Sequence, residues 1–259
     1  MNIQVPGCSG GLAGDNKGGS TCIQINHNIL IDAGTGLNQL SLAQMHQVRH
    51  VFLTHSHMDH IAALPTFLSN QYGSEHLPVT VYAQAHTLEK LENNIFNGDI
   101  WPELGSMTEG PDAIVRFEEI QPDQSITIES NWTKNAAAQS SEITAFAVEH
   151  SVPTVGYSVK SQGRHFVFAA DTIAGKQLTK QLNRLGHIDT LMLECAFPDE
   201  LLHVAEKTKH MTPGLLQSAL SSLKQQPAEL WVTHLKPSYE SALRKTLQAN
   251  PPHKNTVVL

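Results

Sequence analysis

The feature that most constrains the fold is a run of three histidines and one aspartate within six residues, His55-Ser56-His57-Met58-Asp59-His60. It follows a short apolar segment, residues 51–53, and residues 59–70 then carry apolar side chains at helical spacing. The pattern predicts a strand, the polar run, and a helix that tolerates Pro65 in its first turns. Imidazole and carboxylate groups are ligands for zinc, manganese or iron, whereas burying four such groups without partners would cost several kcal/mol. The run therefore predicts a metal site.

Three further candidate ligands share one context, since each comes just after an apolar, strand-like segment. His150 comes after residues 144–148, Asp171 after residues 166–170, and His234 after residues 230–233. In this order behind the H-x-H-x-D-H pattern, they resemble the ligand series of the metallo-β-lactamase superfamily.

That resemblance covers nearly the whole chain and implies one domain over residues 1–259. The implied fold is α/β, a four-layer αββα sandwich of the metallo-β-lactamase type with its metals at one edge of the sheets. It also implies two zinc ions, with manganese or iron as alternatives. One ion would be held by His55, His57 and His150, the other by Asp59, His60 and His234, with Asp171 bridging both. Two metals can share a bridging hydroxide and clamp a phosphoryl oxygen during in-line displacement, so Asp59 and Asp171 are also candidate catalytic residues. Asp32 would orient a ligand histidine.

Several segments are similar to class II 3′,5′-cyclic-nucleotide phosphodiesterases within that superfamily. They are Gly7-Cys8-Ser9-Gly10-Gly11, Met58 before the motif's aspartate, and residues 94–102, 193–197 and 233–237. The resemblance implies hydrolysis of cAMP or cGMP to the nucleoside 5′-monophosphate. The alternative is an RNase Z-like endoribonuclease that processes tRNA 3′ ends, because residues 150–157 and 210–212 resemble that family. Against it, Met58 stands where that family usually has glycine. The segment 98–112 is also acidic, through Asp99, Glu103, Glu109 and Asp112, and would repel phosphates.

Two residues near the expected site have more than one interpretation. His210 precedes a helix predicted to begin at Thr212 and Pro213 and to run to about residue 225. There it either protonates the leaving oxygen or is a surface residue beside a helix cap. Glu194 ends a buried strand and either polarises a histidine or forms an ion pair. Two other classes also fit the ligands: a nucleotide-sensing protein with structural zinc, and a lactonase or thioesterase on the same scaffold.

The overall composition limits the kinds of partner and the location that we expect for this protein. The 259 residues carry 24 acidic and 17 basic side chains, a formal net charge of −7, which disfavours a nucleic-acid partner. The expected partner is the small cyclic nucleotide that the resemblance implies. Three dispersed cysteines fit a reducing cytosol, and no signal peptide or membrane-spanning run is recognisable. We therefore expect a cytoplasmic protein that does not enter membranes. A homodimer is a further expectation, resting only on the prevalence of two-fold symmetry.

Overall fold

A computed structural model describes the chain except for residues 13–17, 73–77, 109–112 and 131–138. Glu109 and Asp112 of the acidic segment lie outside the described residues. The chain divides into two compact units, which we call the N-terminal unit (Asn2–Ile120) and the C-terminal unit (Gln121–Leu259, together with Met1). Each is described by itself, and one domain over residues 1–259 stays a prediction.

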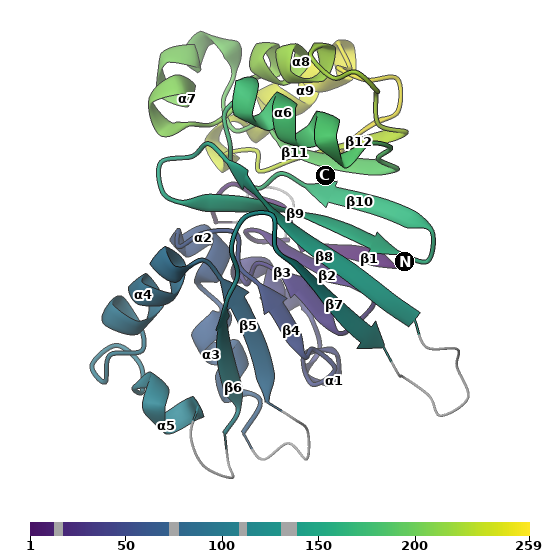
Figure 1. The fold of residues 1–259 in the computed structure, drawn as a ribbon. Coiled ribbons are helices and arrows are strands. Elements are labelled where there is room, and N and C mark those ends of the chain that lie inside the picture. Colours follow the sequence, from purple (N-terminus) through teal and green to yellow (C-terminus); the bar gives the residue numbers. More distant parts are fainter. Residues whose placement is uncertain (13–17, 73–77, 109–112, 131–138) are drawn as a thin grey trace. The chain divides into compact units, whose positions relative to one another are not determined.

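The N-terminal unit is built on a sheet whose described strands follow the order β1-β2-β3-β4-β5-β6 (Figure 1). The strands are β1 (Ile3–Gly7), β2 (Cys22–Ile25), β3 (Ile29–Ile31), β4 (His50–Phe52), β5 (Val79–Ala83) and β6 (Val115–Glu119). The pairs β1–β2 and β2–β3 are antiparallel, and the remaining pairs are parallel. The helices are η1 (Thr35–Gln39), α1 (Leu42–Met45), α2 (Met58–Ile61), α3 (Leu64–Ser69), α4 (Ala85–Asn94) and α5 (Leu104–Thr108). Apolar residues of α3 and α4, such as Phe67 and Leu91, share one core with Val51 and Val81 of the strands.

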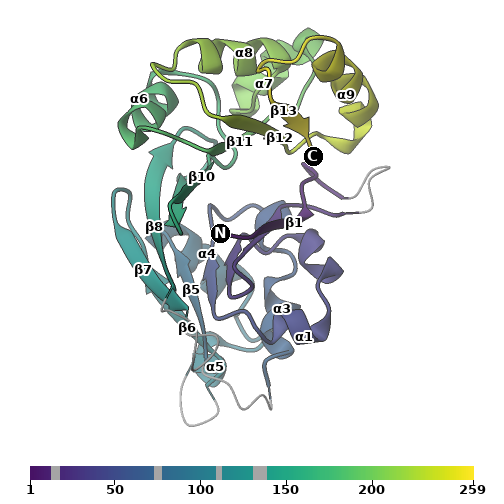
Figure 2. The same cartoon turned by 90° about the vertical axis from the view of Figure 1, so that its right-hand side faces the viewer.

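The C-terminal unit repeats this plan with a sheet in the order β13-β12-β11-β10-β9-β8-β7. The strands are β7 (Ser125–Ser130), β8 (Gln139–Val148), β9 (Thr154–Ser161), β10 (Arg164–Phe168), β11 (Thr190–Glu194), β12 (Glu229–Thr233) and β13 (Thr256–Val258). Strands β7 to β10 pair antiparallel, and β10 to β13 pair parallel. The helices are α6 (Lys176–Leu185), η2 (Asp199–Leu201), α7 (Leu202–Thr208), α8 (Pro213–Ser221), η3 (Pro237–Tyr239) and α9 (Glu240–Ala249). Figure 2 shows α6, α8 and α9 gathered over the β11–β12 part of the sheet, where Leu182, Leu216 and Leu243 pack with Leu191 and Val232.

Most of the expected elements are present, with two differences in the helices. The strands expected at residues 22–25 and 29–31 and the hairpin between β9 and β10 are confirmed. The single helix expected over residues 59–70 is instead two short helices, because the Ala63 amide donates to the Ala33 carbonyl, 2.9 Å away, outside the helix. Pro65 then lies in the first turn of α3. Helix α8 begins as expected, with Thr212 as its cap, but ends at Ser221.

Candidate functional site: two sets of metal-ligand side chains

The H-x-H-x-D-H run lies at the carboxyl end of β4, as the sequence predicts. His55 and His60 are fully buried, and their ring centroids are 4.2 Å apart. The ring of His57 stands edge-on to that of His55 at 4.6 Å. Asp59 lies in the first turn of α2 and is half-buried. The carboxyl end of a parallel strand is where α/β sheets place ligands, so the four side chains occupy a position suited to binding.

The turn Asp32-Ala33-Gly34 packs against the backbone of this run. The Ala33 amide donates to the His60 carbonyl at 2.7 Å. A Cβ on Gly34 would lie 2.2 Å from the Asp59 carbonyl oxygen, so only glycine allows this close approach. Asp32 has a φ of 59°, a left-handed conformation that is uncommon outside glycine. Such backbone strain is typical of sites where surrounding contacts fix the geometry.

Asp32 accepts hydrogen bonds from Thr54 and from a candidate ligand histidine. His60 Nδ1 donates to Oδ2 of Asp32 at 2.7 Å, and the Thr54 amide donates to Oδ1 at 2.8 Å. Burial raises the pKa of the Asp32 carboxyl, and the hydrogen bonds from His60 and Thr54 act in the opposite direction. The expected contact between Asp32 and a histidine of the run is therefore present.

The C-terminal unit brings His150, Asp171 and His234 together. Nε2 of His234 lies 3.2 Å from Oδ2 of Asp171, and Nε2 of His150 lies 4.0 Å from the same oxygen. Asp171 is 2% exposed and His234 is 1% exposed. His234 and Ala170, the residue before Asp171, both have left-handed φ values, 62° and 56°. His234 follows β12 directly and Ala170 is the second residue after β10, and these turns bring the side chains of His234 and Asp171 to within 3.2 Å of each other.

A second acidic group, Glu194 at the end of β11, holds His210 beside this set. Nδ1 of His210 donates to Glu194 at 2.7 Å, and the amides of Thr172 and Met211 donate to the same carboxylate at 2.9 Å and 3.1 Å. Burial alone would lower the pKa of His210, but the adjacent Glu194 carboxylate outweighs it and raises that pKa.

His210 also has aromatic neighbours that hold it among the candidate ligands. Its ring stacks on His234 at 5.2 Å and meets His150 edge-on at 5.0 Å. Ligand atoms of Asp171, Glu194 and His210 lie within 4.8 Å of one another. The alternative of a surface histidine for His210 is wrong, because the residue is only 6% exposed.

Each unit thus presents one part of the predicted site, and the structure adds residues that the sequence did not single out. The N-terminal unit groups His55, His57, Asp59 and His60, and the C-terminal unit groups His150, Asp171, His210 and His234. Thr54 and Thr172 were missed, because a threonine that follows a strand carries no distinctive signal. Their roles depend on which carboxylate lies opposite, and only the fold determines that.

The donor chemistry of both groups fits a metal ion. His60 donates from Nδ1 to Asp32, so its Nε2 carries the lone pair that a metal requires. Buried carboxylate and imidazole groups clustered at strand ends are the oxygen and nitrogen ligands of zinc, manganese and iron. The residues present therefore suit a metal.

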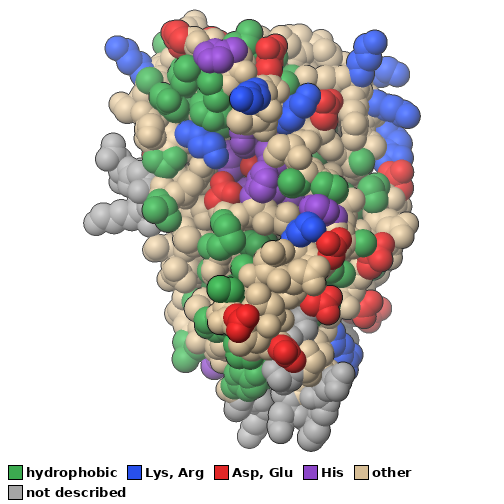
Figure 3. Space-filling model, turned by 90° about the vertical axis from the view of Figure 1, so that its left-hand side faces the viewer, with side chains coloured by type: hydrophobic (Ala, Val, Ile, Leu, Met, Phe, Trp, Pro, Cys, Tyr) green, Lys and Arg blue, Asp and Glu red, His purple; other side chains and the backbone are tan. Residues whose placement is uncertain are grey.

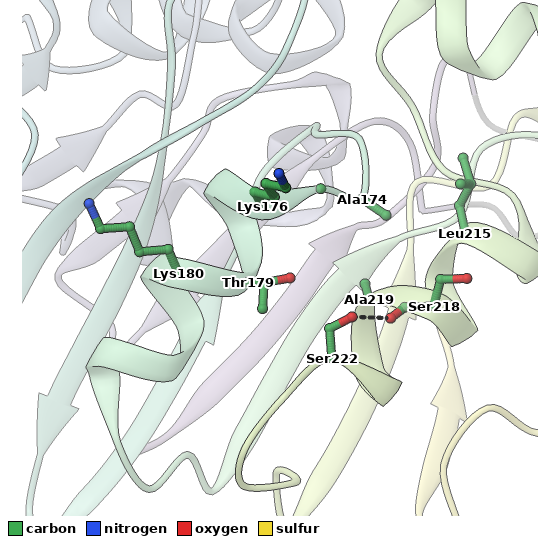
Figure 4. Close-up of a pocket in the computed structure, with 9 residues that line it drawn as sticks. Ala174, Lys176, Thr179, Lys180, Leu215, Ser218, Ala219 and Ser222 are labelled. Carbon is green, nitrogen blue, oxygen red and sulfur yellow. Dashed lines mark hydrogen bonds between the residues drawn. The ribbon is translucent and has the colours of Figure 1, made fainter.

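The groove between α6 and α8 offers no competing site. Figure 4 shows this cavity of about 470 Å³, lined by Ala174, Gly175, Lys176, Thr179, Lys180, Leu215, Ser218, Ala219 and Ser222. The lining holds no histidine, cysteine or carboxylate, and the ammonium groups of Lys176 and Lys180 lie apart rather than converging. The groove has no ligand set for a metal.

Comparison with known proteins agrees with the class that the fold and these side chains define, a metal-dependent hydrolase. Residues 27–235 match the family model described as the β-lactamase superfamily domain, and the chain belongs to that family. The metallo-β-lactamase fold protein YhfI from Bacillus subtilis has the same fold, with a TM-score of 0.75 and 20% sequence identity over 99% of this chain and 94% of that one. The predicted fold class is confirmed.

Two curated relatives carry functional names. A probable 3′,5′-cyclic-nucleotide phosphodiesterase of Yersinia pestis is 24% identical over 74% of this chain and 58% of its own length. A ribonuclease Z of Pyrococcus abyssi is 26% identical over 56% of this chain and 42% of its own length. The chain thus spans less than two thirds of either relative.

Among the described residues, no helix is long and apolar enough to cross a membrane.

Proposed function

We propose that this protein is a metal-dependent phosphodiesterase that hydrolyses 3′,5′-cyclic nucleotides to nucleoside 5′-monophosphates. The observation that carries the proposal is the Glu194–His210 pair beside Asp171, a proton donor next to a candidate metal ligand. A phosphodiesterase needs such a group, because the leaving alkoxide must be protonated. The named activity of the Yersinia pestis relative supports the same substrate class.

The proposed metal centre takes ligands from both units, following the family to which the chain belongs. His55, His57 and His150 would hold one ion, Asp59, His60 and His234 the other, and Asp171 would bridge them. The family model spans residues 27–235 and so includes both groups. When bound, the two ions would polarise the phosphoryl oxygens and lower the pKa of a water. Zinc is the proposed metal, with manganese or iron as alternatives.

The protein's own residues would then perform three tasks. Asp59 and Asp171 would orient the attacking water in line with the bond that breaks. The Glu194 carboxylate would keep a proton on Nδ1 of His210 and hold the ring in place. Nε2 of His210 would donate its proton to the 3′ oxygen as that oxygen leaves the phosphorus.

A second candidate is an RNase Z-like endoribonuclease, favoured by the named activity of the Pyrococcus abyssi relative. It requires a surface that attracts RNA phosphates. Figure 3 looks onto the face that carries α4 and α5; exposed red carboxylates gather in the lower part of this view, and blue lysine and arginine side chains are visible in its upper part. Glu89, Glu92, Asp99 and Glu103 are exposed there, and Lys90 is bonded to Glu89 at 2.8 Å. This acidic surface favours the small cyclic substrate over RNA.

The test is hydrolysis of cAMP by the purified protein, with and without a chelator, with 5′-AMP and 3′-AMP separated by chromatography. Chelator-sensitive release of 5′-AMP alone supports the proposal. Asp171→Ala should abolish turnover and reduce bound metal to one ion or none. Glu206→Ala, which removes an exposed carboxylate of α7, should change neither. A metal-loaded protein that leaves cAMP intact contradicts the substrate assignment, and cleavage of precursor tRNA would then favour the second candidate.

A further inference from the structure

Thr54 contacts two of the candidate metal ligands, His55 and His60, and also Asp32, the carboxylate that is hydrogen-bonded to His60. It is fully buried, the second residue after the end of β4 and directly before His55. Its Oγ1 lies 2.9 Å from Oδ2 of Asp32 and 2.9 Å from Nδ1 of His55. A longer contact of 3.4 Å reaches Nδ1 of His60.

The directions of these bonds follow from the number of protons available. A threonine hydroxyl has one proton to donate, and a carboxylate only accepts. The Thr54 hydroxyl therefore donates to Asp32, and its oxygen accepts from Nδ1–H of His55. His60 donates its own Nδ1–H to Oδ2 of Asp32 as well. In both histidines the proton is then on Nδ1, and Nε2 carries the lone pair.

The backbone of Thr54 strengthens the same arrangement. Its amide donates to Oδ1 of Asp32 at 2.8 Å, so one residue makes both an amide and a hydroxyl bond to that carboxylate. Asp32 itself has a left-handed φ of 59°. One side chain thus links the tautomer of His55 to the carboxylate that orients His60.

We infer that Thr54 is a positioning residue that sets the tautomer and ring orientation of His55 and, through Asp32, of His60, so that both present Nε2 to a metal ion. The inference rests on the proposed metal centre and names the group that prepares it. Partners behind a metal ligand typically contribute 10-fold to 100-fold in metal affinity. The hydroxyl should account for an effect of that size, because it contacts Nδ1 of His55 at 2.9 Å.

Three variants of the full-length protein separate this role from ordinary packing. Thr54→Val keeps the shape of the side chain and removes the hydroxyl. Thr54→Ser keeps the hydroxyl and removes a methyl group. Thr87→Val is the matched control, because Thr87 is a fully buried threonine of the same unit whose Oγ1 has no hydrogen-bond partner among the described residues.

Two measurements apply to these variants, and neither depends on the identity of the substrate. The first is zinc affinity of the metal-stripped protein in competition with a chromophoric chelator. The second is ¹⁵N NMR of the histidine rings in the metal-free protein, which reports the protonated nitrogen. We expect wild type to show Nδ1–H for His55 and His60. Thr54→Val should bind zinc about 10-fold to 100-fold more weakly, and its His55 signals should shift more than those of His60, which keeps Asp32. Thr54→Ser and Thr87→Val should stay near wild type.

Two results for the zinc affinity overturn the inference. Unchanged zinc affinity in Thr54→Val, or equal losses in Thr54→Ser and Thr54→Val, would remove the role of the hydroxyl while leaving the proposed function intact. A protein that binds zinc as inferred but hydrolyses no cyclic nucleotide would instead remove the proposed substrate alone. If Thr54→Val does not fold, the ¹⁵N spectrum of the wild-type protein tests the inference by itself. A proton on Nε2 rather than Nδ1 of His55 would overturn it, because the Thr54 oxygen could then not accept from that ring.

Discussion

His50, the first residue of β4, should make the folded state sensitive to acid. Its ring stacks on Tyr82 at a centroid distance of 6.1 Å, and its Nδ1 is buried with no hydrogen-bond partner in the described part of the chain. Burial, with a smaller contribution from the charge of Arg49, lowers the pKa of His50 from 6.5 to about 4. The imidazolium form is thus disfavoured in the folded protein and free to form in the unfolded one.

The sign of the effect follows from proton binding. Above pH 6.5 the ring is neutral in both states and contributes nothing to the pH dependence. Between pH 6.5 and about 4 the unfolded chain binds a proton that the folded chain does not, so the free energy of unfolding falls as the pH falls. Each pH unit across this interval is worth about 1.4 kcal/mol. The loss between about pH 7 and about pH 5 is therefore about 2 kcal/mol.

The perturbation is His50→Phe, which keeps an aromatic ring against Tyr82 and removes the titrating group. Urea unfolding at both pH values, with chelator present so that metal release does not contribute, gives the free energies. Wild type should lose about 2 kcal/mol more than the variant as the pH is lowered. His203→Gln, at an exposed position on α7, is the control and should follow wild type. If His50→Phe and wild type lose the same free energy, the burial argument for His50 is refuted.

Two further predictions concern backbone packing and the proton donor. Gly36→Ala should destabilise the protein by more than about 2 kcal/mol in urea unfolding, because a Cβ there would lie 2.3 Å from the Gly7 Cα. Gly105→Ala, in α5 with nothing within 4 Å of its Cβ position, should be neutral or stabilising by up to about 1 kcal/mol. Glu194→Gln should lower kcat by about 100-fold with little change in KM or metal content, because His210 loses its charged partner. A change confined to KM would contradict that role for Glu194.

The sequence places the ligand candidates at the ends of strands, because each placement depends on a local pattern. An apolar run predicts a strand, and a polar residue directly after it is placed at the strand's end. Asp171 after β10 and His234 after β12 are examples, and both strands pair in parallel with β11. His150 follows the same rule after β8, although β8 pairs antiparallel with both neighbours.

The partners behind these residues could not be predicted, because each pairing joins segments distant in the sequence. Thr54 contacts Asp32, 22 residues away, and Glu194 contacts His210, 16 residues away. For Glu194, the sequence left open whether the carboxylate polarises a histidine or forms an ion pair. In the structure it accepts from His210 and from two backbone amides, and the amides hold it in position. A carboxylate that accepts from Thr172, Met211 and His210 at once is fixed in place before any ligand binds.

Asp32 in the N-terminal unit and Glu194 in the C-terminal unit therefore have similar roles. Asp32 accepts from the amide and hydroxyl of Thr54 and orients His60, while Glu194 accepts from two amides and orients His210. In each case at least one backbone amide donates to the carboxylate, and the carboxylate accepts from Nδ1 of an imidazole. The consequence is that both rings present Nε2, one suited to a metal and the other to proton donation. Both rings are oriented in the same way, by a carboxylate that accepts from Nδ1. Whether the histidine acts as a metal ligand or as an acid therefore depends on the group that Nε2 faces, a metal ion or the leaving oxygen.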